Sequence, residues 1–220
     1  MNDLTLVIPA KFESGPLPQV IRELQKYNCK ILVSLQGDDL ETINAIQRFN
    51  IQIHKQSGAG YGNSLIEGIQ NCNTKYFCIF NADGSFDNTD LSLMYKMIKQ
   101  NDFIFTSRYE KNAGSEDDTL VTFIGNKVFS LIGRILFSLK ISDILFTYIM
   151  GNTKSFKKLN IKSNDFRFCV ELPIKMHLAK MKYQTLPSYE KKRISGVKKV
   201  SAFKDGFLIL IEILKLFFMY

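Results

Sequence analysis

The stretch YFCIFNADGSFDN (residues 76–88) places polar side chains directly behind an apolar run. Its first five residues have the composition of a buried strand, and Asn81, Asp83, Ser85 and Asp87 follow at once. Hard divalent cations such as Mg²⁺ bind oxygen ligands of these kinds, commonly one or two carboxylates completed by substrate phosphates. Ala-Asp-Gly is also ordinary turn chemistry. The stretch therefore indicates either a metal site or a structural turn.

Apolar runs of strand length recur along the first half of the chain and alternate with helical patterns. The expected strands are 4–8, 30–35, 51–54, 76–80 and 103–106, and the expected helices are 17–27, 39–49, 61–70 and 89–99. This alternation predicts an α/β fold with a Rossmann-like, mainly parallel central sheet flanked by helices. Ligands of such sheets bind beyond the carboxyl ends of the strands, which is where Asp83 lies.

The second half of the chain changes character. We expect a long helix over 120–140, with a stripe of polar residues along one side, and a strand over 183–188. Residues 206–220 form an apolar tail of roughly 22 Å as a helix, short of a roughly 30 Å hydrocarbon core. We therefore expect a domain over 1–205 with C-terminal amphipathic helices. The tail lies in a membrane interface or on a membrane-protein partner, or closes the core, and we expect no spanning helix.

The totals describe one domain with an anionic partner. The 220 residues are 45% hydrophobic and 23% charged, and the net charge is +8. Such a charge favours a nucleotide, a phosphorylated lipid, a phospholipid surface or nucleic acid, but no nucleic-acid reader motif is recognisable, so we expect no nucleic acid. The four cysteines lack CxxC spacing and the N-terminus has no basic leader. Both indicate a reducing, cytoplasmic setting.

Two loops are candidates for binding a nucleotide. In GAGYGNSLIEGI (58–69), glycines that include Gly58 and Gly60 open a helix, where backbone amides can approach an anion. A tight connection that needs positive φ explains the same glycines. In VIPAKFES (7–14), a strand end is followed by an aromatic and a carboxylate, which suit a base and a ribose but also an ordinary surface loop. The candidate residues in this loop are Pro9, Lys11, Phe12 and Glu13.

Cations are the remaining candidates. Arg108 follows the fifth strand, Lys127 and Arg134 share a helix face, and a basic run that includes Arg193 and Lys199 precedes the tail. These side chains suit the phosphates of a nucleotide or of a lipid. A basic run of this kind is equally a solvated face or an adaptor for lipid headgroups.

Taken together, these segments resemble the family 2 glycosyltransferases, which have a GT-A fold. They resemble most the polyprenyl-phosphate branch around dolichyl-phosphate mannose synthase. The resemblance covers residues 4 to about 206 in order. It rests on VIPAKFES, GAGYGNSLIEGI, FNADGSFD, TSRY (106–109), ISDILFTY (141–148) and TLPSYEKKRISGVKKV (185–200). These are similar to the family's VIPAYNE, GxGxAxxxGI, DAD metal turn, GSRY, acceptor-site Asp segment and EVPVxYxxRxxGxSK.

The resemblance implies a set of site residues. Asp83, with Asn81 and Ser85, would hold Mg²⁺ or Mn²⁺, although the family's first metal-turn Asp is Asn81 here. Gln36 and Asp38 stand where the family has a VDDGS-type turn that contacts the base. Asp143 takes the place of the acceptor-site Asp, but the Gly-Phe-Arg expected after it reads Thr-Tyr-Ile.

The implied activity is inverting, metal-dependent hexosyl transfer from a nucleotide-sugar donor, with Asp83, Asp143 and Arg108 as catalytic residues. The acceptor would be a polyprenyl phosphate at the cytoplasmic face of the membrane. An acceptor phosphate needs no general base, whereas a sugar hydroxyl would need one, for which Asp143 is the candidate. The alternatives are a glycan acceptor in surface polysaccharide synthesis and a non-catalytic membrane-bound subunit. A nucleotidyltransferase would also use such a sheet and Mg²⁺, but its Gly-rich loop near the first strand is missing.

Overall fold

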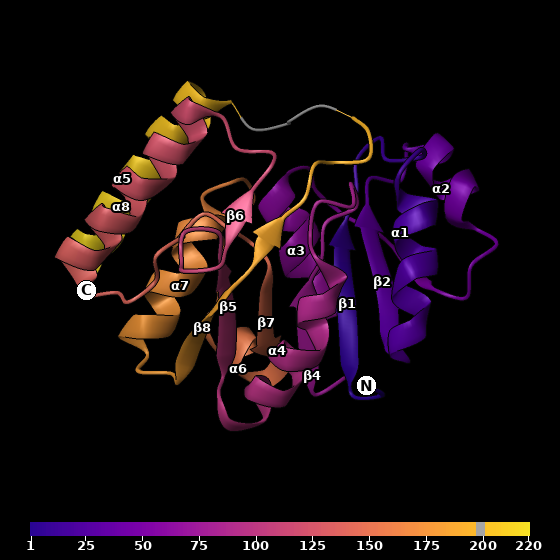
Figure 1. Ribbon diagram of the computed structural model, residues 1–220, viewed down its shortest axis with the longest axis horizontal. Helices are drawn as coiled ribbons and strands as arrows, with labels where there is room; N and C mark the ends of the chain where they lie inside the picture. Colours follow the sequence, from indigo (N-terminus) through magenta and orange to yellow (C-terminus); the bar gives the residue numbers. More distant parts are fainter. Residues whose placement is uncertain (197–200) are drawn as a thin grey trace.

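The computed structural model describes residues 1–196 and 201–220. A seven-stranded sheet in the order β3-β2-β1-β4-β7-β5-β8 forms its centre, and a two-stranded ribbon, β6-β9, lies above one edge (Figure 1). The paired strands of the large sheet are parallel except for β7, which runs antiparallel to both neighbours. The strands are β1 (Leu4–Pro9), β2 (Lys30–Leu35), β3 (Gln52–Lys55), β4 (Tyr76–Ile79), β5 (Phe103–Ser107), β6 (Gly114–Ser115), β7 (Ile149–Asn152), β8 (Tyr183–Pro187) and β9 (Tyr189–Glu190).

Helices cover both faces of the sheet. The α-helices are α1 (Leu17–Leu24), α2 (Leu40–Ile46), α3 (Tyr61–Gln70), α4 (Leu91–Met97), α5 (Leu120–Phe137), α6 (Thr153–Lys158), α7 (Phe168–Leu178) and α8 (Ala202–Met219). Short 3₁₀ turns are η1 (Gln25–Tyr27), η2 (Asn88–Asp90) and η3 (Ile98–Gln100). The first core joins α1, α2 and α4 to one face of the sheet, and the second joins α3, α6, α7 and α8 to the other. The expected α/β architecture is confirmed.

The expected strands and the helices up to residue 140 are found within a few residues of their predicted bounds. The sequence patterns assigned no element to residues 149–178, where β7, α6 and α7 lie. β7 is a four-residue strand that contains Gly151, and α7 carries Pro173 inside it and is buried nearly all round. Periodicity gives little signal for such elements, because no polar face marks their orientation.

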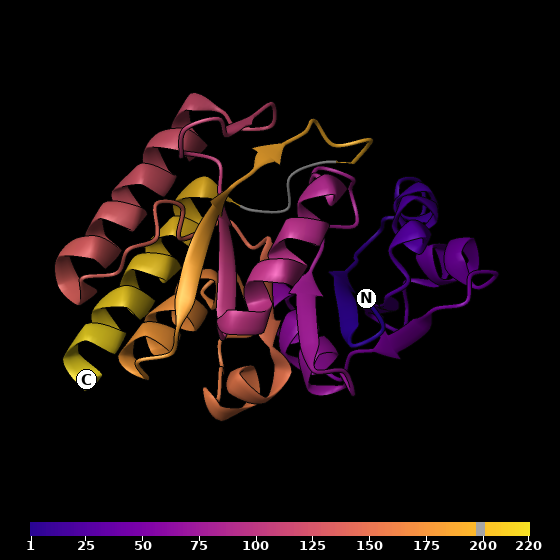
Figure 2. The same cartoon turned by 60° about the horizontal axis from the view of Figure 1, so that its bottom comes forward.

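α5 and α8 lie side by side at one end of the molecule, as both ribbon views show (Figures 1 and 2). α8 begins at Ala202, ahead of the expected boundary at 205/206, and its Ile209, Ile213 and Leu216 are buried in the second core. The tail therefore closes the core with one face. Its other face, with Phe203, Phe207 and further apolar side chains, is exposed.

α5 likewise divides its surface between the domain and solvent. Asn126, Ser130, Gly133 and Phe137 are buried against the domain, while apolar side chains from Leu120 onward are exposed. By length and composition alone, α5 would be able to cross a membrane, whereas we expected no helix that could. The buried polar residues fit a helix that lies on its domain.

Candidate active site

The acidic turn after β4 presents three hard oxygen ligands within residues 81–85. Asp83 accepts a hydrogen bond from the Ser85 backbone N–H at 3.0 Å, and the Asn81 amide donates to the Ser85 hydroxyl at 3.3 Å. Gly84 has φ 80°, which the tight turn needs and a residue with a Cβ rarely adopts. Asp87, the expected second carboxylate, instead pairs with Lys191 at 3.0 Å and caps the following 3₁₀ turn.

The turn therefore offers one carboxylate. Among the described residues, no group of three or more His, Cys, Asp or Glu side chains could hold a metal ion. One carboxylate, one amide and one hydroxyl fit a magnesium-like cation only if further oxygens complete its coordination. The phosphates of a nucleotide would be such oxygens. The residues present thus fit a metal that arrives with its substrate better than a permanently bound one.

The loop 191–196 lies over this turn. The backbone N–H groups of Lys191 and Ile194 donate to the carbonyls of Ser85 and Asp83 at 2.8 and 2.9 Å. Arg193 bonds Asp117 at 2.6 Å, and its guanidinium reaches Asp83 at 3.7 Å. The hydrogen bonds to Asp117 raise the pKa of Arg193. Arg193, a predicted phosphate ligand, therefore lies beside the metal turn.

The same loop extends toward the β1–α1 connection. A Cβ at Gly196 would lie 3.8 Å from the Glu13 carboxylate, and one at Gly15 would lie 3.4 Å from the Ser195 hydroxyl. The loop thus connects the metal turn with the expected nucleoside loop. Lys199, the other candidate cation of this segment, falls outside the described residues.

The expected nucleoside loops are neighbours at the carboxyl edge of β1 and β2. Phe12 has φ 54° and is 70% exposed, while Glu13 is buried. Asp39 organises both loops, because its carboxylate accepts the N–H of Phe12 at 2.6 Å and the N–H of Thr42 at 3.2 Å. Lys11 lies with its ammonium near the Phe12 ring.

In the loop between β2 and α2, the carboxylate that organises the backbone is Asp39, the neighbour of the predicted base contact Asp38. Gln36 is half-buried and Asp38 is exposed, whereas Asp39 is buried and caps α2. The signal was present, since Asp39 stands at the position of a helix N-cap, three residues before the Thr42 whose N–H it accepts. Pro9 ends β1 and is half-buried beside these loops.

In this structure, the glycines of the loop before α3 allow close packing against another backbone segment, 163–165. A Cβ at Gly60, where φ is 117°, would lie 2.1 Å from the Asn164 carbonyl oxygen. That same carbonyl accepts the Asn63 N–H at 2.9 Å, at the start of α3. The prediction that Gly60 cradles a phosphate is therefore corrected, because the 163–165 backbone occupies the helix start and the tight-connection interpretation fits. Gly58 belongs to the same connection, where its carbonyl accepts a hydrogen bond from the Asn63 side chain at 3.0 Å.

Glu67 of α3 holds the connection between β3 and α3 by hydrogen bonds. Its carboxylate accepts hydrogen bonds from the backbone and hydroxyl of Ser57, from Asn63 and from His54 at 2.6 to 3.2 Å. Burial acts to raise the pKa of Glu67, but these hydrogen bonds outweigh it and lower the pKa to about 2. The carboxylate therefore stays ionised and fixes the loop before α3.

Arg108, at the end of β5, is buried in a cage of acids. Its guanidinium bonds both oxygens of Asp143 at 2.7 and 3.0 Å and the Glu190 carboxylate at 3.0 Å, with Asp118 at 3.6 Å. The ring of Phe146 covers it at 4.5 Å. Burial opposes the charge, but the carboxylates outweigh it and raise the pKa of Arg108.

This pairing changes two expected roles. Arg108 was expected to bind a phosphate and Asp143 to serve as a possible general base. In the structure each satisfies the other, and Asp143 is 1% exposed. Asp143 fixes the guanidinium instead of facing a substrate. Through Asp118 and Asp117, which are adjacent in the chain, the cage continues to Arg193 and so to Asp83.

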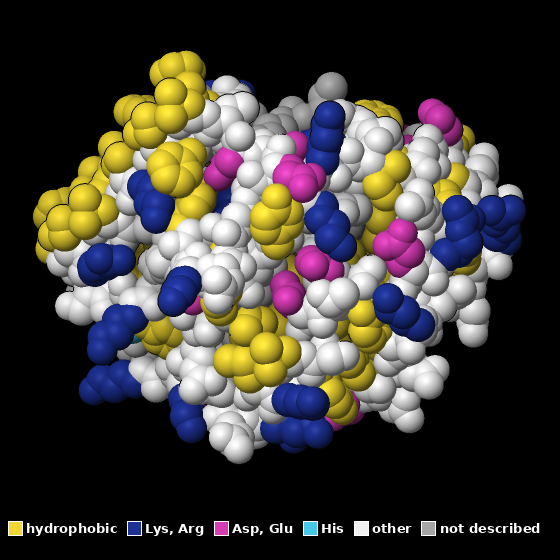
Figure 3. Space-filling view, in the orientation of Figure 1, with side chains coloured by type: hydrophobic (Ala, Val, Ile, Leu, Met, Phe, Trp, Pro, Cys, Tyr) yellow, Lys and Arg dark blue, Asp and Glu magenta, His cyan; other side chains and the backbone are white. Residues whose placement is uncertain are grey.

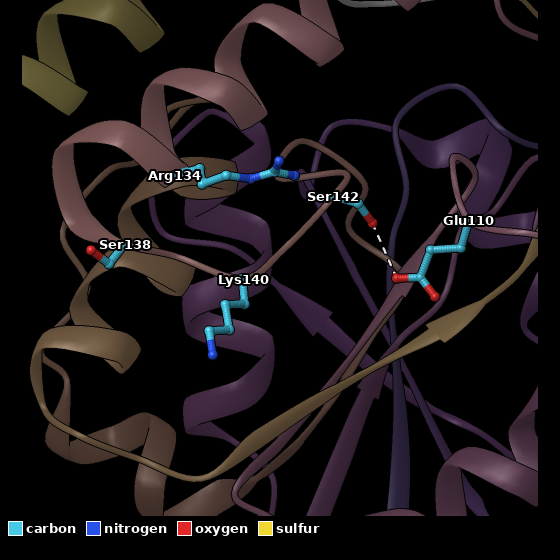
Figure 4. Close-up of a pocket in the computed structure, with 5 residues that line it drawn as sticks. All are labelled: Glu110, Arg134, Ser138, Lys140 and Ser142. Carbon is cyan, nitrogen blue, oxygen red and sulfur yellow. Dashed lines mark hydrogen bonds between the residues drawn. The ribbon is translucent and has the colours of Figure 1, made fainter.

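Arg134 lies in a different place from these groups. It points from α5 into a cavity of about 480 Å³ whose other lining residues are Glu110, Ser138, Lys140 and Ser142 (Figure 4). Arg134, which we expected to bind phosphates of the donor or of a lipid acceptor, thus lies apart from the metal turn. The sequence alone does not show that Arg193 lies beside the metal turn and that Arg134 does not.

Comparison with known proteins adds the family. The model of Glycosyl transferase family 2 matches residues 5–160. Uncharacterised glycosyltransferases of Mycobacterium bovis and Mycobacterium tuberculosis are 24% identical over 209 residues, which cover 94% of each chain.

Solved structures share the fold. Glucosyl-3-phosphoglycerate synthase of Mycobacterium tuberculosis, crystallised with Mn²⁺, UDP and glucosyl-3-phosphoglycerate, superposes with a TM-score of 0.75 at 10% identity. The alignment covers 97% of this chain and 79% of that one. Mannosyl-3-phosphoglycerate synthase of Rubrobacter xylanophilus gives a TM-score of 0.69 at 12% identity, over 97% of this chain and 72% of that one. The family model matches most of the length of this chain, and the chain has the GT-A architecture. The chain therefore belongs to glycosyl transferase family 2.

Proposed function

We propose that the protein is a metal-dependent, inverting hexosyltransferase that uses a nucleotide-diphosphate sugar. The observation that carries this proposal is the turn of Asn81, Asp83 and Ser85 at the carboxyl edge of β4, with Arg193 held at 3.7 Å from Asp83. A single carboxylate and a nearby cation suit a diphosphate better than they suit a free metal ion. A related fold crystallised with Mn²⁺ and UDP supports the same assignment.

Asp83 would hold Mg²⁺ or Mn²⁺ together with Asn81 and Ser85. The metal, when bound, neutralises charge that develops on the leaving diphosphate. Arg193 adds a second positive charge on the same side, and the carboxylates of its neighbours fix it in place. One displacement at the anomeric carbon inverts its configuration.

The nucleoside would lie against the β1–α1 and β2–α2 loops. Phe12 exposes an aromatic ring next to Lys11, and the following residue, Glu13, is buried. Asp39 fixes the backbone of Phe12 and so holds the ring at the edge of the sheet. A ring suits stacking on a base, and a carboxylate suits ribose hydroxyls.

For the acceptor, we propose a polyprenyl phosphate at the cytoplasmic face of a membrane. Large apolar side chains are exposed along α5 and α8, which lie side by side. A domain with such a surface can rest on a bilayer, where lipid acceptors reside. A phosphate acceptor is anionic at neutral pH and needs no general base, which agrees with Asp143 being paired to Arg108.

A soluble phosphate-bearing acceptor is the second candidate. Related solved structures include glucosyl- and mannosyl-3-phosphoglycerate synthases, and the glucosyl enzyme has been crystallised with phosphoglyceric acid. Phosphoglyceric acid carries a hydroxyl group beside its phosphate, and transfer to that hydroxyl would need a base. A sugar hydroxyl is favoured less, because the Asp143 carboxylate that would activate it is held by both oxygens.

The test is donor binding by calorimetry with UDP-, GDP- and dTDP-sugars, with and without Mn²⁺ or Mg²⁺. We expect one donor to bind in a metal-dependent way and Asp83→Ala to abolish this. Product formation is then compared with a short polyprenyl phosphate, phosphoglycerate and a free sugar as acceptors. Absence of binding by any donor to the folded protein would contradict the enzyme assignment and favour a non-catalytic membrane-bound subunit.

A further inference from the structure

A groove runs along the polar side of α5. The cavity lined by Arg134, Ser138, Lys140 and Ser142 shares Arg134 and Ser142 with a second hollow of about 310 Å³. The second hollow extends along the helix to Lys127. We call the two together the α5 groove. Its residues come from α5, from the segment that follows α5 and from the segment that follows β5, and none belongs to the metal turn.

The cations of the α5 groove differ from those of the active site. Within residues 1–196 and 201–220, Lys127, Arg134 and Lys140 have no carboxylate at ion-pairing distance, whereas Arg108 and Arg193 each have several. Glu110 is the acid that lines the groove, and its carboxylate accepts the Ser142 hydroxyl at 3.1 Å (Figure 4). Three cations against one acid leave the groove positive.

This chemistry suits a phosphate. Arg134 offers a planar set of N–H donors, Lys140 offers an ammonium, and Ser138 and Ser142 offer hydroxyl groups. Guanidinium and ammonium groups form their strongest hydrogen bonds with charged oxygens. An anion in the groove would therefore find the charges of Arg134 and Lys140, which no carboxylate of the described residues pairs, while the Ser142 hydroxyl is already bonded to Glu110.

The groove adjoins an apolar surface on the same helix. Leu131 lies one turn after Lys127, and Ile135 directly follows Arg134; both apolar side chains are more than half exposed, at 51% and 68%. In the space-filling view, dark-blue cations border the yellow band that covers this end of the molecule (Figure 3). Cations beside an exposed apolar band match the boundary between the headgroups and the acyl chains of a bilayer.

We propose that the α5 groove binds the phosphate headgroup of an anionic membrane lipid while the exposed faces of α5 and α8 enter the interface. The inference rests on the proposed membrane location, and it adds a lipid site that is separate from the donor and metal residues. The apolar band selects a lipid over a free phosphate, because a soluble anion gains nothing from Leu131 and Ile135.

The test is sedimentation with vesicles of phosphatidylcholine, with and without phosphatidylglycerol. Wild-type protein is compared with Arg134→Gln/Lys140→Gln and with the control Arg22→Gln/Lys30→Gln. The control removes the same charge from exposed positions on α1 and β2, at the other end of the sheet (Figure 1). A cation close to an anionic surface contributes about fivefold to the partition coefficient. We therefore expect a loss of roughly 25-fold for the groove variant and less than about twofold for the control.

Circular dichroism and thermal unfolding confirm that each variant is folded. Equal losses in the groove variant and the control, or no loss in either, would overturn the proposal. Inorganic phosphate is titrated without vesicles as a separate arm. Tight binding there, without preference for anionic vesicles, would assign the groove to a soluble ligand. Donor binding by wild-type protein, measured in solution, tests the proposed function independently of any vesicle result.

Discussion

Arg108 and Arg134 were both expected to bind phosphates, and the structure treats them in opposite ways. Arg108 is buried and surrounded by Asp143, Glu190 and Asp118, while Arg134 is exposed in a groove without an acid at ion-pairing distance among the described residues. A buried charge costs several kcal/mol unless it is paired, roughly the amount that separates a folded from an unfolded small domain. The fold therefore satisfies the charge of Arg108 internally and leaves the guanidinium of Arg134 exposed in the α5 groove.

The contrast predicts different costs for the same substitution. Arg108→Met should lower the free energy of unfolding by about 3–5 kcal/mol, since it leaves buried carboxylates without their cation. Arg134→Met should change it by less than about 0.5 kcal/mol. Urea unfolding of both variants measures the difference. Similar changes in the free energy of unfolding for the two variants would contradict the conclusion that burial makes Arg108 the more important arginine for stability.

Asp83 in the metal turn differs from both arginines, because its proposed partner is a divalent metal ion that binds from solution. Asp83→Asn should lower turnover at saturating metal by at least roughly 100-fold, because stabilisation of the leaving diphosphate is worth several kcal/mol. Asp87→Asn is the matched control four residues away, and it should cost less than about threefold, as Asp87 pairs with Lys191. Equal losses would assign the metal to both acids.

Glu67 shows that a carboxylate can also be satisfied without a lysine or an arginine. Its pKa is lowered from 4.5 to about 2, so its stabilising effect is present above about pH 4.5 and is lost as the pH falls toward 2. Glu67→Gln should lower the free energy of unfolding by about 1.5–3 kcal/mol near neutral pH. Urea unfolding at several pH values should show this difference shrinking in acid. A constant difference would contradict the assignment.

The smallest expected effect concerns Arg193, which serves both the fold and the site. Its 3.7 Å contact with Asp83 opposes metal binding when no diphosphate is present. Arg193→Ala should therefore tighten Mn²⁺ binding in the absence of donor by about two- to threefold, the size expected of a partly exposed ion pair. Lys191→Ala, whose partner is Asp87, should leave it unchanged. Calorimetry measures both, and weaker binding in Arg193→Ala would contradict the prediction.

The sequence predicted much of the edge of the sheet at which the candidate site lies. Lys11, Asp83 and Arg108 each follow a continuous apolar run, and this pattern is visible within a few consecutive residues. The sequence patterns named Asp38 as a candidate base contact but did not identify its neighbour Asp39 as the acid that organises the nucleoside loops. The Phe12 N–H donates to the carboxylate that faces it across the two loops, and only the folded structure shows that this carboxylate is Asp39.

Contacts between distant segments were beyond the sequence patterns. Arg108 lies 35 residues from Asp143 and 82 from Glu190, and no spacing rule joins them. Gly60 looked like part of a phosphate loop, but its lack of a side chain accommodates the Asn164 carbonyl. In both cases the deciding partner comes from another part of the fold.

The sequence by itself determined the parallel α/β core and the acidic turn behind β4, because both follow from periodicity and from the oxygen chemistry of a few consecutive residues. Only the tertiary structure decided which charges are paired. Coulomb energies depend on distance and burial, and these were set when β5, the 141–148 segment and β9 came together around Arg108. The same packing left Lys127, Arg134 and Lys140 at the rim of an exposed apolar face.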